Sequence, residues 1–183
     1  RGHGAADHQD GIVERLHRID DGIDRLAVLL AQAGRGFARA VEIAVESART
    51  GGGPFGCVVV TERGVYEGHN EVVSRCDPSA HAEVQAIRAA ARAQRTHQLS
   101  GAVLYASGQP CPMCFAAIRW ARIDEVYYAA TYAQAADAGF DDSFISDVMV
   151  GRVPDPSPFR HVPLDQSNAP FEAWAANSDR VEY

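Results

Sequence analysis

Apolar and polar residues follow one another along the chain in patterns that predict a long helix first and shorter elements later. Between residues 12 and 33, apolar residues recur every three or four positions with acids and arginines between them, which predicts an amphipathic helix. Gly34 and Gly36 are expected to end this helix. We interpret residues 1–36 as an N-terminal helical extension that packs on its own domain or pairs with another chain. Its stripe consists of Ile12, Leu16, Ile19, Ile23, Leu26, Leu30 and Ala33.

From residue 37 onward, helical and β-type patterns alternate regularly, with a looser proline-containing stretch near the C-terminus. A helix, then a hairpin, then alternating helices and strands are typical of an α/β fold. The sequence therefore predicts a three-layer α/β/α sandwich around a central mixed sheet. The expected helices are 37–49, 81–94, 112–121, 132–138 and 171–176, and the expected strands are 55–61, 65–69, 103–106 and 125–130.

The charge of the chain narrows the possible chemistry. All 17 basic residues are arginines, and with 24 acidic residues they give a net charge of −7. The absence of lysine excludes Schiff-base, pyridoxal phosphate and P-loop mechanisms that use a lysine of this chain. Six of the seven excess negative charges lie in residues 137–183. Because proteins that bind nucleic acid present a basic face, we expect no nucleic-acid partner.

Apolar runs and cysteines indicate the setting in which the protein works. No apolar run approaches the roughly 20 residues that span a bilayer, so no membrane partner is expected. Four cysteines are too few for a disulfide framework in a chain of 183 residues. Cys111 and Cys114 form a C-x-x-C pair, which is typical of metal or redox chemistry in a reducing compartment. We therefore expect a cytoplasmic protein.

Two short motifs, HAE at 81–83 and PCPMC at 110–114, each open a predicted helix. Cys111 and Cys114 are three residues apart, so both thiols fall on one face of a helical turn. The start of a helix also favours the thiolate form that a metal ion requires. Together with His81, these residues form a ligand set that suits Zn²⁺, and three protein ligands leave a fourth position for water. The alternatives are a structural zinc site or a thiol pair without metal.

Glu83 adds a proton carrier to this set. On an ideal helix, residues 81 and 83 point about 200° apart, so His81 and Glu83 can share a site only at the tip of the helix. There, Glu83 would take a proton from water, whose pKa zinc lowers from about 15.7 toward neutrality, and pass it to a substrate nitrogen and the leaving amine. The pattern H-x-E followed by P-C-x-x-C is the signature of zinc-dependent deaminases.

Further motifs make the resemblance more specific. Residues 37–183 resemble bacterial guanine deaminases of the cytidine-deaminase-like superfamily, so we interpret this range as a zinc-dependent deaminase domain. The resemblance implies a homodimer in which the C-terminal segments are exchanged. The matching motifs are GGPFG (52–56), EGHNEV (67–72), DPSAHAEVQAIR (77–88), PCPMC (110–114), AIRWAR (117–122), AGFDDSFI (138–145), PFEAW (170–174) and the final EY.

The resemblance also assigns roles to individual residues. It implies that His81, Cys111 and Cys114 bind zinc and that Glu83 shuttles protons. It further implies that Asn70 hydrogen-bonds a purine and that Asp142 holds the N–H side of the ring and assists proton transfer. The remaining predicted substrate-binding residues are Phe55, Ala82, Trp120 and Tyr183, the last of which would help to close the pocket.

These assignments have structural alternatives. Asn70 could be a turn residue, and Asp142 could be a solvated loop acid. Trp120 could pack in the core, and Tyr183 could belong to a frayed terminus.

The reaction expected from the resemblance is the hydrolysis of guanine to xanthine and ammonia. One departure is that Gly108-Gln109 stands where family members commonly have Cys-Glu, which leaves another aminated ring open as substrate. The alternatives are a deaminase of guanosine, of another aminopurine or of a triazine, and a tRNA adenosine deaminase. A zinc-containing assembly module that uses the helical extension is the alternative that is not an enzyme.

Overall fold

The computed structural model describes the backbone of residues 25–157 and 159–182, and their side chains from residue 34 onward. The helices are α2 (Arg25–Arg49), α3 (Val72–Arg75), α4 (Ala82–Gln94), α5 (Pro112–Trp120), α6 (Tyr132–Asp137), α7 (Ser143–Met149) and α8 (Ala169–Ala176). The strands are β1 (Gly56–Thr61), β2 (Gly64–His69), β3 (Val103–Gly108) and β4 (Glu125–Ala130).

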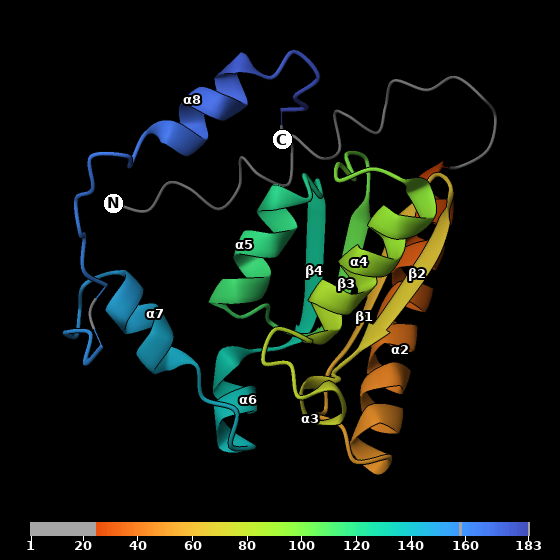
Figure 1. The fold of residues 1–183 in the computed structure, drawn as a ribbon. Helices are drawn as coiled ribbons and strands as arrows, with labels where there is room; N and C mark the ends of the chain where they lie inside the picture. Colours follow the sequence, from red (N-terminus) through yellow and green to blue (C-terminus); the bar gives the residue numbers. More distant parts are fainter. Residues whose placement is uncertain (1–24, 158, 183) are drawn as a thin grey trace, which may run out of the picture.

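The four strands form one mixed sheet in the order β2-β1-β3-β4. Strand β1 runs antiparallel to β2 and to β3, whereas β3 and β4 are parallel and are joined through α5. Helix α2 covers one face of the sheet, and α4 and α5 cover the other (Figure 1). The predicted three-layer sandwich is therefore confirmed.

Helix α2 is longer than the sequence predicts. It continues through Gly34 and Gly36, so the expectation that these glycines end a helix is wrong. The reason at Gly36 is packing, because a Cβ atom there would lie 2.5 Å from the ring of Tyr105 on β3. The glycine lets the helix lie close against the sheet. The expected helix 37–49 is the second half of α2, and residues 12–24 of the apolar stripe lie outside the described residues.

The core has two parts, one on each side of the sheet. Alternate residues of β1 point to opposite faces, so Cys57 and Val59 face α4 while Val58 faces α2. On the α4 side, the strands approach the helix very closely. A Cβ atom at Gly68 of β2 would overlap the backbone of Ala82 and Ala86. This contact places the beginning of α4 directly beside the end of β2.

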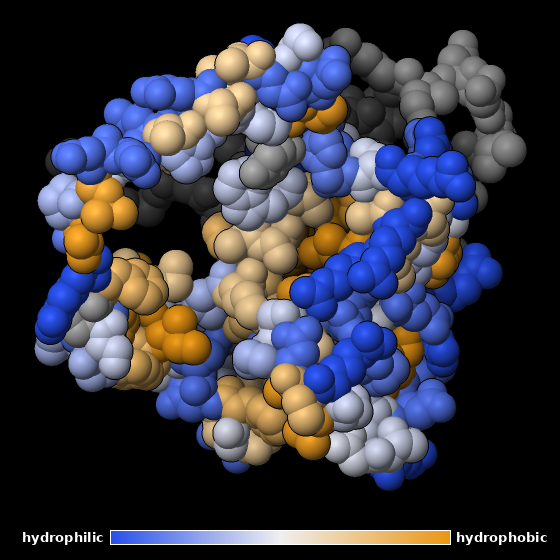
Figure 2. Space-filling model, in the orientation of Figure 1, coloured by the Kyte–Doolittle hydropathy of each residue, from blue (hydrophilic) through white to orange (hydrophobic). Residues whose placement is uncertain are grey.

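The chain beyond β4 contributes little to this core. Within the described residues, α6, α7 and α8 contain no buried residue. Helices α7 and α8 lie away from the sheet (Figure 1), and Figure 2 shows a hollow between this segment and the body of the molecule. Helix α8 corresponds to the helix that the sequence predicts near 171–176. In the part of the chain that the structure describes, no helix has the length and apolar character needed to cross a membrane.

Candidate functional site

The sequence motifs around His81 and Cys111 meet at one end of the sheet, where α4 and α5 begin. His81 directly precedes α4, and Cys111 directly precedes α5, with Cys114 in the first turn of α5. Nδ1 of His81 lies 3.5 Å from Sγ of Cys111 and 3.6 Å from Sγ of Cys114. All three candidate ligand atoms lie within 4.8 Å of one another. The structure therefore brings together the three residues that the sequence assigns to a metal.

The spacing of these atoms fits a tetrahedral zinc ion. Zinc bonds of about 2.1 Å to nitrogen and about 2.3 Å to sulfur, at tetrahedral angles, separate the two ligand atoms by about 3.6 Å. The Nδ1–Sγ distances given above agree with this value. One imidazole and two thiols are also the donor types that zinc prefers. Among the described residues, three side chains converge here, which leaves the fourth tetrahedral position to water.

The charge state of the cluster also suits a metal ion. The pKa of the Cys111 thiol is lowered to about 4, first because Cys114 donates a hydrogen bond to its sulfur and then because His81 does so. The contact with Cys111 in turn raises the pKa of His81. The hydrogen bond that Cys114 donates to Cys111 and the burial of Cys114 both raise the pKa of the Cys114 thiol. The two helix N-termini that meet here also favour the negative charge of a thiolate ligand.

Glu83 lies in the first turn of α4 and is only 7% exposed. His81 has an extended backbone, with φ −70° and ψ 155°, so it stands ahead of the helix and is not part of its spiral. This arrangement meets the condition that His81 and Glu83 can share a site only at the tip of a helix. Burial raises the pKa of Glu83, and its carboxylate contacts Cys114. A carboxyl group with a raised pKa beside a metal site is suited to accepting a proton and passing it on.

The sequence that carries these residues matches a known protein family. A model of the cytidine and deoxycytidylate deaminase zinc-binding region matches residues 31–130, just over half of the chain. This chain belongs to that deaminase family. The cofactor of the family is zinc, in agreement with the donor set formed by His81, Cys111 and Cys114.

Within this family, the chain is similar to individual proteins of known activity. The deaminase is 45% identical to the guanine deaminase of Bacillus subtilis over 148 residues, which cover 79% of this chain and 95% of that protein. The crystal structure of the Bacillus subtilis guanine deaminase superposes with a TM-score of 0.78 and covers 82% of this chain and 98% of that one, at 44% identity.

Two more distant relatives match less of the chain. A guanine deaminase structure from Nitrosomonas europaea has a TM-score of 0.54 at 31% identity and covers 58% of this chain and 63% of that one. The tRNA-specific adenosine deaminase of Agrobacterium fabrum is 40% identical over 95 residues, which cover 49% of this chain and 62% of that protein. The chain is thus a guanine deaminase homologue in a zinc-dependent deaminase family.

The deaminase has a cavity of about 510 Å³ directly beside the metal-binding cluster. His81 and Cys111 line one side of it, so a molecule in the cavity would contact the metal ligands. The other walls mix apolar rings with polar groups. Among the lining residues are Phe55, Asn70, Gln109, Tyr132, Phe140 and Asp142.

Asp142 brings an unpaired carboxylate oxygen to this cavity. Among the described residues, its Oδ2 atom is buried and has no hydrogen-bond partner. Burial raises the pKa of Asp142, and the negative charge of Cys111 raises it further. A buried oxygen without a donor is costly. This atom is therefore suited to a ligand that supplies an N–H group.

The other predicted substrate residues fall into two groups. Phe55 and Asn70 line the cavity, as the sequence predicts. Ala82 is completely buried in the core, whereas Trp120 is 62% exposed at the end of α5. Neither is among the described residues that line the cavity. Tyr183 lies outside the described residues. The predicted roles of Ala82, Trp120 and Tyr183 remain predictions.

Sequence patterns assign no role to Tyr132 and Phe140, which both line the cavity. Tyr132 donates a hydrogen bond through its hydroxyl group to the carbonyl oxygen of Pro110 at 2.6 Å, and its backbone N–H donates to Oε1 of Gln109 at 3.3 Å. Phe140 packs edge-on against Phe55, with ring centroids 5.0 Å apart. The AGFDDSFI motif contains Phe140, but Tyr132 has no local sequence signal because its contacts depend on the fold.

Proposed function

We propose that this deaminase hydrolyses guanine to xanthine and ammonia. The observation that carries the substrate is the buried, unpaired Oδ2 of Asp142 in the same cavity as His81 and Cys111. Guanine presents N–H donors at N1 and at its 2-amino group, which match a carboxylate acceptor. The similarity to a guanine deaminase over 95% of that protein's length supports the same substrate.

In this proposal, His81, Cys111 and Cys114 hold the zinc ion. When bound, zinc lowers the pKa of a coordinated water molecule toward 7 and so supplies a nucleophile near neutral pH. Glu83 would accept a proton from the attacking water and donate it to the ring nitrogen beside the attacked carbon. A second proton transfer through Glu83 lets the amine leave as ammonia, so that guanine and water give xanthine and ammonia.

Three further residues bind and orient the ring. The aromatic face of Phe55 packs against the purine, while Asn70 and Asp142 hydrogen-bond its polar edge. Asp142 accepts from the N–H side of the ring and assists in the proton transfer. These groups line one cavity, so a ring held by them would lie next to the metal ligands His81 and Cys111, which line the same cavity.

The proposed active form is a homodimer with exchanged C-terminal segments. Exposed apolar side chains on the C-terminal segment support this dimer: Phe171 on α8 is 71% exposed, and Phe159 is fully exposed. Large exposed apolar surfaces of this kind are typical of subunit interfaces. We also propose a cytoplasmic setting, because none of the four cysteines, all of which lie within the described residues, forms a disulfide.

A substrate panel tests the proposal. Zinc-loaded protein is incubated with guanine, guanosine, guanosine monophosphate, other aminopurines, an aminotriazine and tRNA, and ammonia release is measured. We expect more ammonia release from guanine than from any other compound of the panel. Guanosine monophosphate and tRNA in particular should be poor substrates, because the acidic C-terminal quarter disfavours substrates that carry phosphate. Turnover of tRNA in place of guanine would instead support the activity that the tRNA-specific relatives carry.

A further inference from the structure

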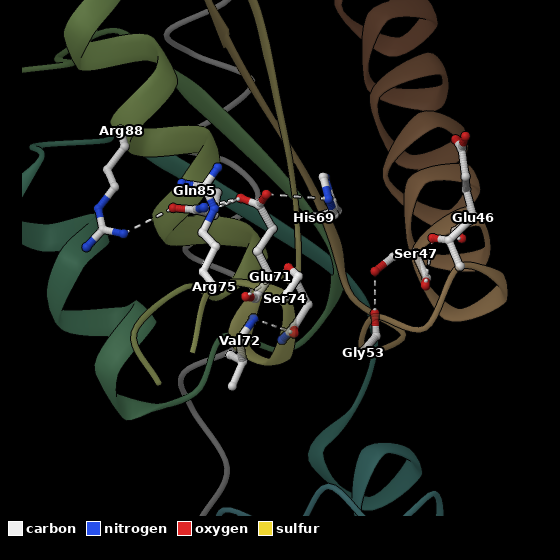
Figure 3. A network of polar contacts seen from close by, with 12 residues as sticks. Glu46, Ser47, Gly53, His69, Glu71, Val72, Ser74, Arg75, Gln85 and Arg88 are labelled. Carbon is white, nitrogen blue, oxygen red and sulfur yellow. Dashed lines mark hydrogen bonds and ion pairs between the residues drawn. The ribbon is translucent and has the colours of Figure 1, made fainter. Parts of the chain in front are cut away.

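Glu71 lies between strand β2 and helix α3 and contacts helix α4 through Gln85, at the centre of a polar network (Figure 3). Its side chain is only 18% exposed. Its Oε2 atom accepts hydrogen bonds from the side-chain amide of Gln85 and from Nε of Arg75, the latter at 2.9 Å. Its Oε1 atom lies 3.8 Å from Nε2 of His69. Burial raises the pKa of Glu71, but the hydrogen bonds from Arg75 and Gln85 outweigh it, so the carboxylate stays charged.

Gln85 connects this network to the metal-binding end of α4. Its backbone N–H donates to the carbonyl oxygen of His81 at 2.9 Å, so it lies one helical turn after that residue. Its Oε1 atom accepts from Arg88 at 3.1 Å, and Arg88 also donates to the hydroxyl group of Ser79 at 3.3 Å. The network therefore contacts both the first turn of α4 and the loop that leads into it.

On its other side, Glu71 follows directly after Asn70, a residue of the cavity wall. The backbone N–H of Glu71 donates to Ala80 at 2.9 Å, and that of Asn70 donates to Phe55 at 3.1 Å. The side-chain oxygen of Asn70 accepts from the backbone N–H of Val72 at 3.3 Å. The direction of the Asn70 amide therefore depends on how the end of β2 is held against α4. Glu71 is the charged side chain that holds it there.

We infer that Glu71 is a positioning residue for the deamination: its carboxylate fixes Asn70 relative to His81 and Glu83. Glu71 is not among the described residues that line the cavity, so it acts through Asn70 and not on the ring itself. This inference rests on the proposed function, in which Asn70 binds the ring. A loosened hydrogen bond from Asn70 weakens binding about three- to tenfold. Because this bond is present in both the ground state and the transition state, the loss raises KM and leaves kcat nearly unchanged.

The test compares Glu71→Ala with Glu67→Ala. Glu67 lies on the same strand and forms an ion pair with Arg39 of α2 at 2.7 Å, so its removal also deletes a salt bridge but leaves the cavity untouched. Each substitution is made in the active protein, for KM and kcat, and in a Glu83→Gln background that binds without turnover. Equilibrium dialysis with radiolabelled guanine then gives Kd, and metal analysis gives the zinc content. Glu71→Gln, which keeps an acceptor for Gln85, serves as the rescue variant.

We expect Glu71→Ala to raise Kd and KM three- to tenfold at unchanged zinc content, with Glu71→Gln close to the parent protein and Glu67→Ala unchanged. Equal Kd values for Glu71→Ala and Glu67→Ala would overturn the inference, as would a loss of zinc in parallel with kcat. If Glu71→Ala does not fold, Gln85→Ala removes the hydrogen bond from α4 to Glu71, together with the one that Gln85 accepts from Arg88, and is held to the same criteria. If the Glu83→Gln parent itself does not bind guanine, the proposed substrate is wrong, and the comparison is made with the ring that the panel identifies.

Discussion

Phe55 packs edge-on against Phe140, with ring centroids 5.0 Å apart and an interplanar angle of 88°. This contact joins the segment before β1 to the loop that carries Asp142, although 85 residues separate the two rings in the chain. We expect Phe140→Ala to raise KM for guanine about tenfold, because the loop loses its apolar support and Asp142 is held less firmly. Steady-state kinetics measure this. Phe115→Ala, which removes a ring exposed on α5, should leave KM unchanged.

The carboxylate of Asp142 is expected to contribute directly to binding and proton transfer. Replacement by asparagine keeps the shape but presents an N–H group to the donor side of guanine, so kcat/KM should fall about 10- to 100-fold. Asp137→Asn on α6 is the matched control, because that residue is exposed and outside the cavity wall. Equal activity of both variants would mean that Asp142 is only a loop acid.

Zinc content should depend on Cys111 and not on Cys76. Cys111→Ser replaces a thiolate ligand and should reduce bound zinc from one ion per chain to a small fraction, together with ammonia release. Cys76→Ser changes an exposed free thiol of the same kind and should retain both. Removal of zinc from the parent protein by a chelator should abolish activity, and added zinc should restore it. Metal analysis of the purified variants checks this, and full zinc occupancy in Cys111→Ser would exclude this cysteine as a ligand.

The stability of the fold should depend on pH through Glu67. The hydrogen bond from Arg39 lowers the pKa of Glu67 below its ordinary value of 4.5. Because the folded-state pKa is depressed, the stabilisation is fully present above the unfolded-state pKa and is lost as the pH falls through the folded-state value. The pair is partly exposed, so the effect is small and weakens with salt. Urea unfolding should show parent and Glu67→Gln differing at pH 7 and converging as the pH falls through the folded-state pKa of Glu67. A constant difference over this range would contradict it.

Exchange of the C-terminal segment predicts that two inactive proteins can complement each other. One copy carries Glu83→Gln with an intact C-terminus, and the other keeps Glu83 but lacks residues 169–183. Each alone should be inactive, whereas a mixture should recover part of the parent activity, because the intact segment completes the site that contains Glu83. Ammonia release and light scattering measure this. Two monomeric proteins without recovered activity would contradict the proposed exchange.

Local patterns predict much of this fold because they reflect local physics. The short β run at 55–61 and the alanine-rich segment at 81–94 appear as β1 and α4, since local strand and helix propensities suffice there. The glycines of α2 are different. Gly36 resembles a helix stop, yet its role is set by Tyr105, almost 70 residues away, and no local pattern contains that contact.

The candidate site shows the same division. The meeting of His81, Cys111 and Cys114 could be predicted because metal ligands follow fixed spacings at helix starts, and Glu83 belongs to the same H-x-E motif as His81. Tyr132 could not, because its hydrogen bonds to Gln109 and Pro110 arise only when β4 lies beside β3. The burial of the Asp142 Oδ2 atom likewise depends on how the loop folds beside the cavity, although the motif around this residue is recognisable.

The most direct measurement of the central claim is the conversion of guanine by protein of verified zinc content. The account predicts one xanthine and one ammonia for each guanine consumed, with Glu83→Gln reducing the rate about 10²- to 10⁴-fold at unchanged zinc content. Glu62→Gln, a substitution of an exposed residue in the β1–β2 turn, should leave the rate unchanged. Zinc-loaded protein that leaves guanine intact, or a Glu83→Gln variant as active as the parent, would contradict it.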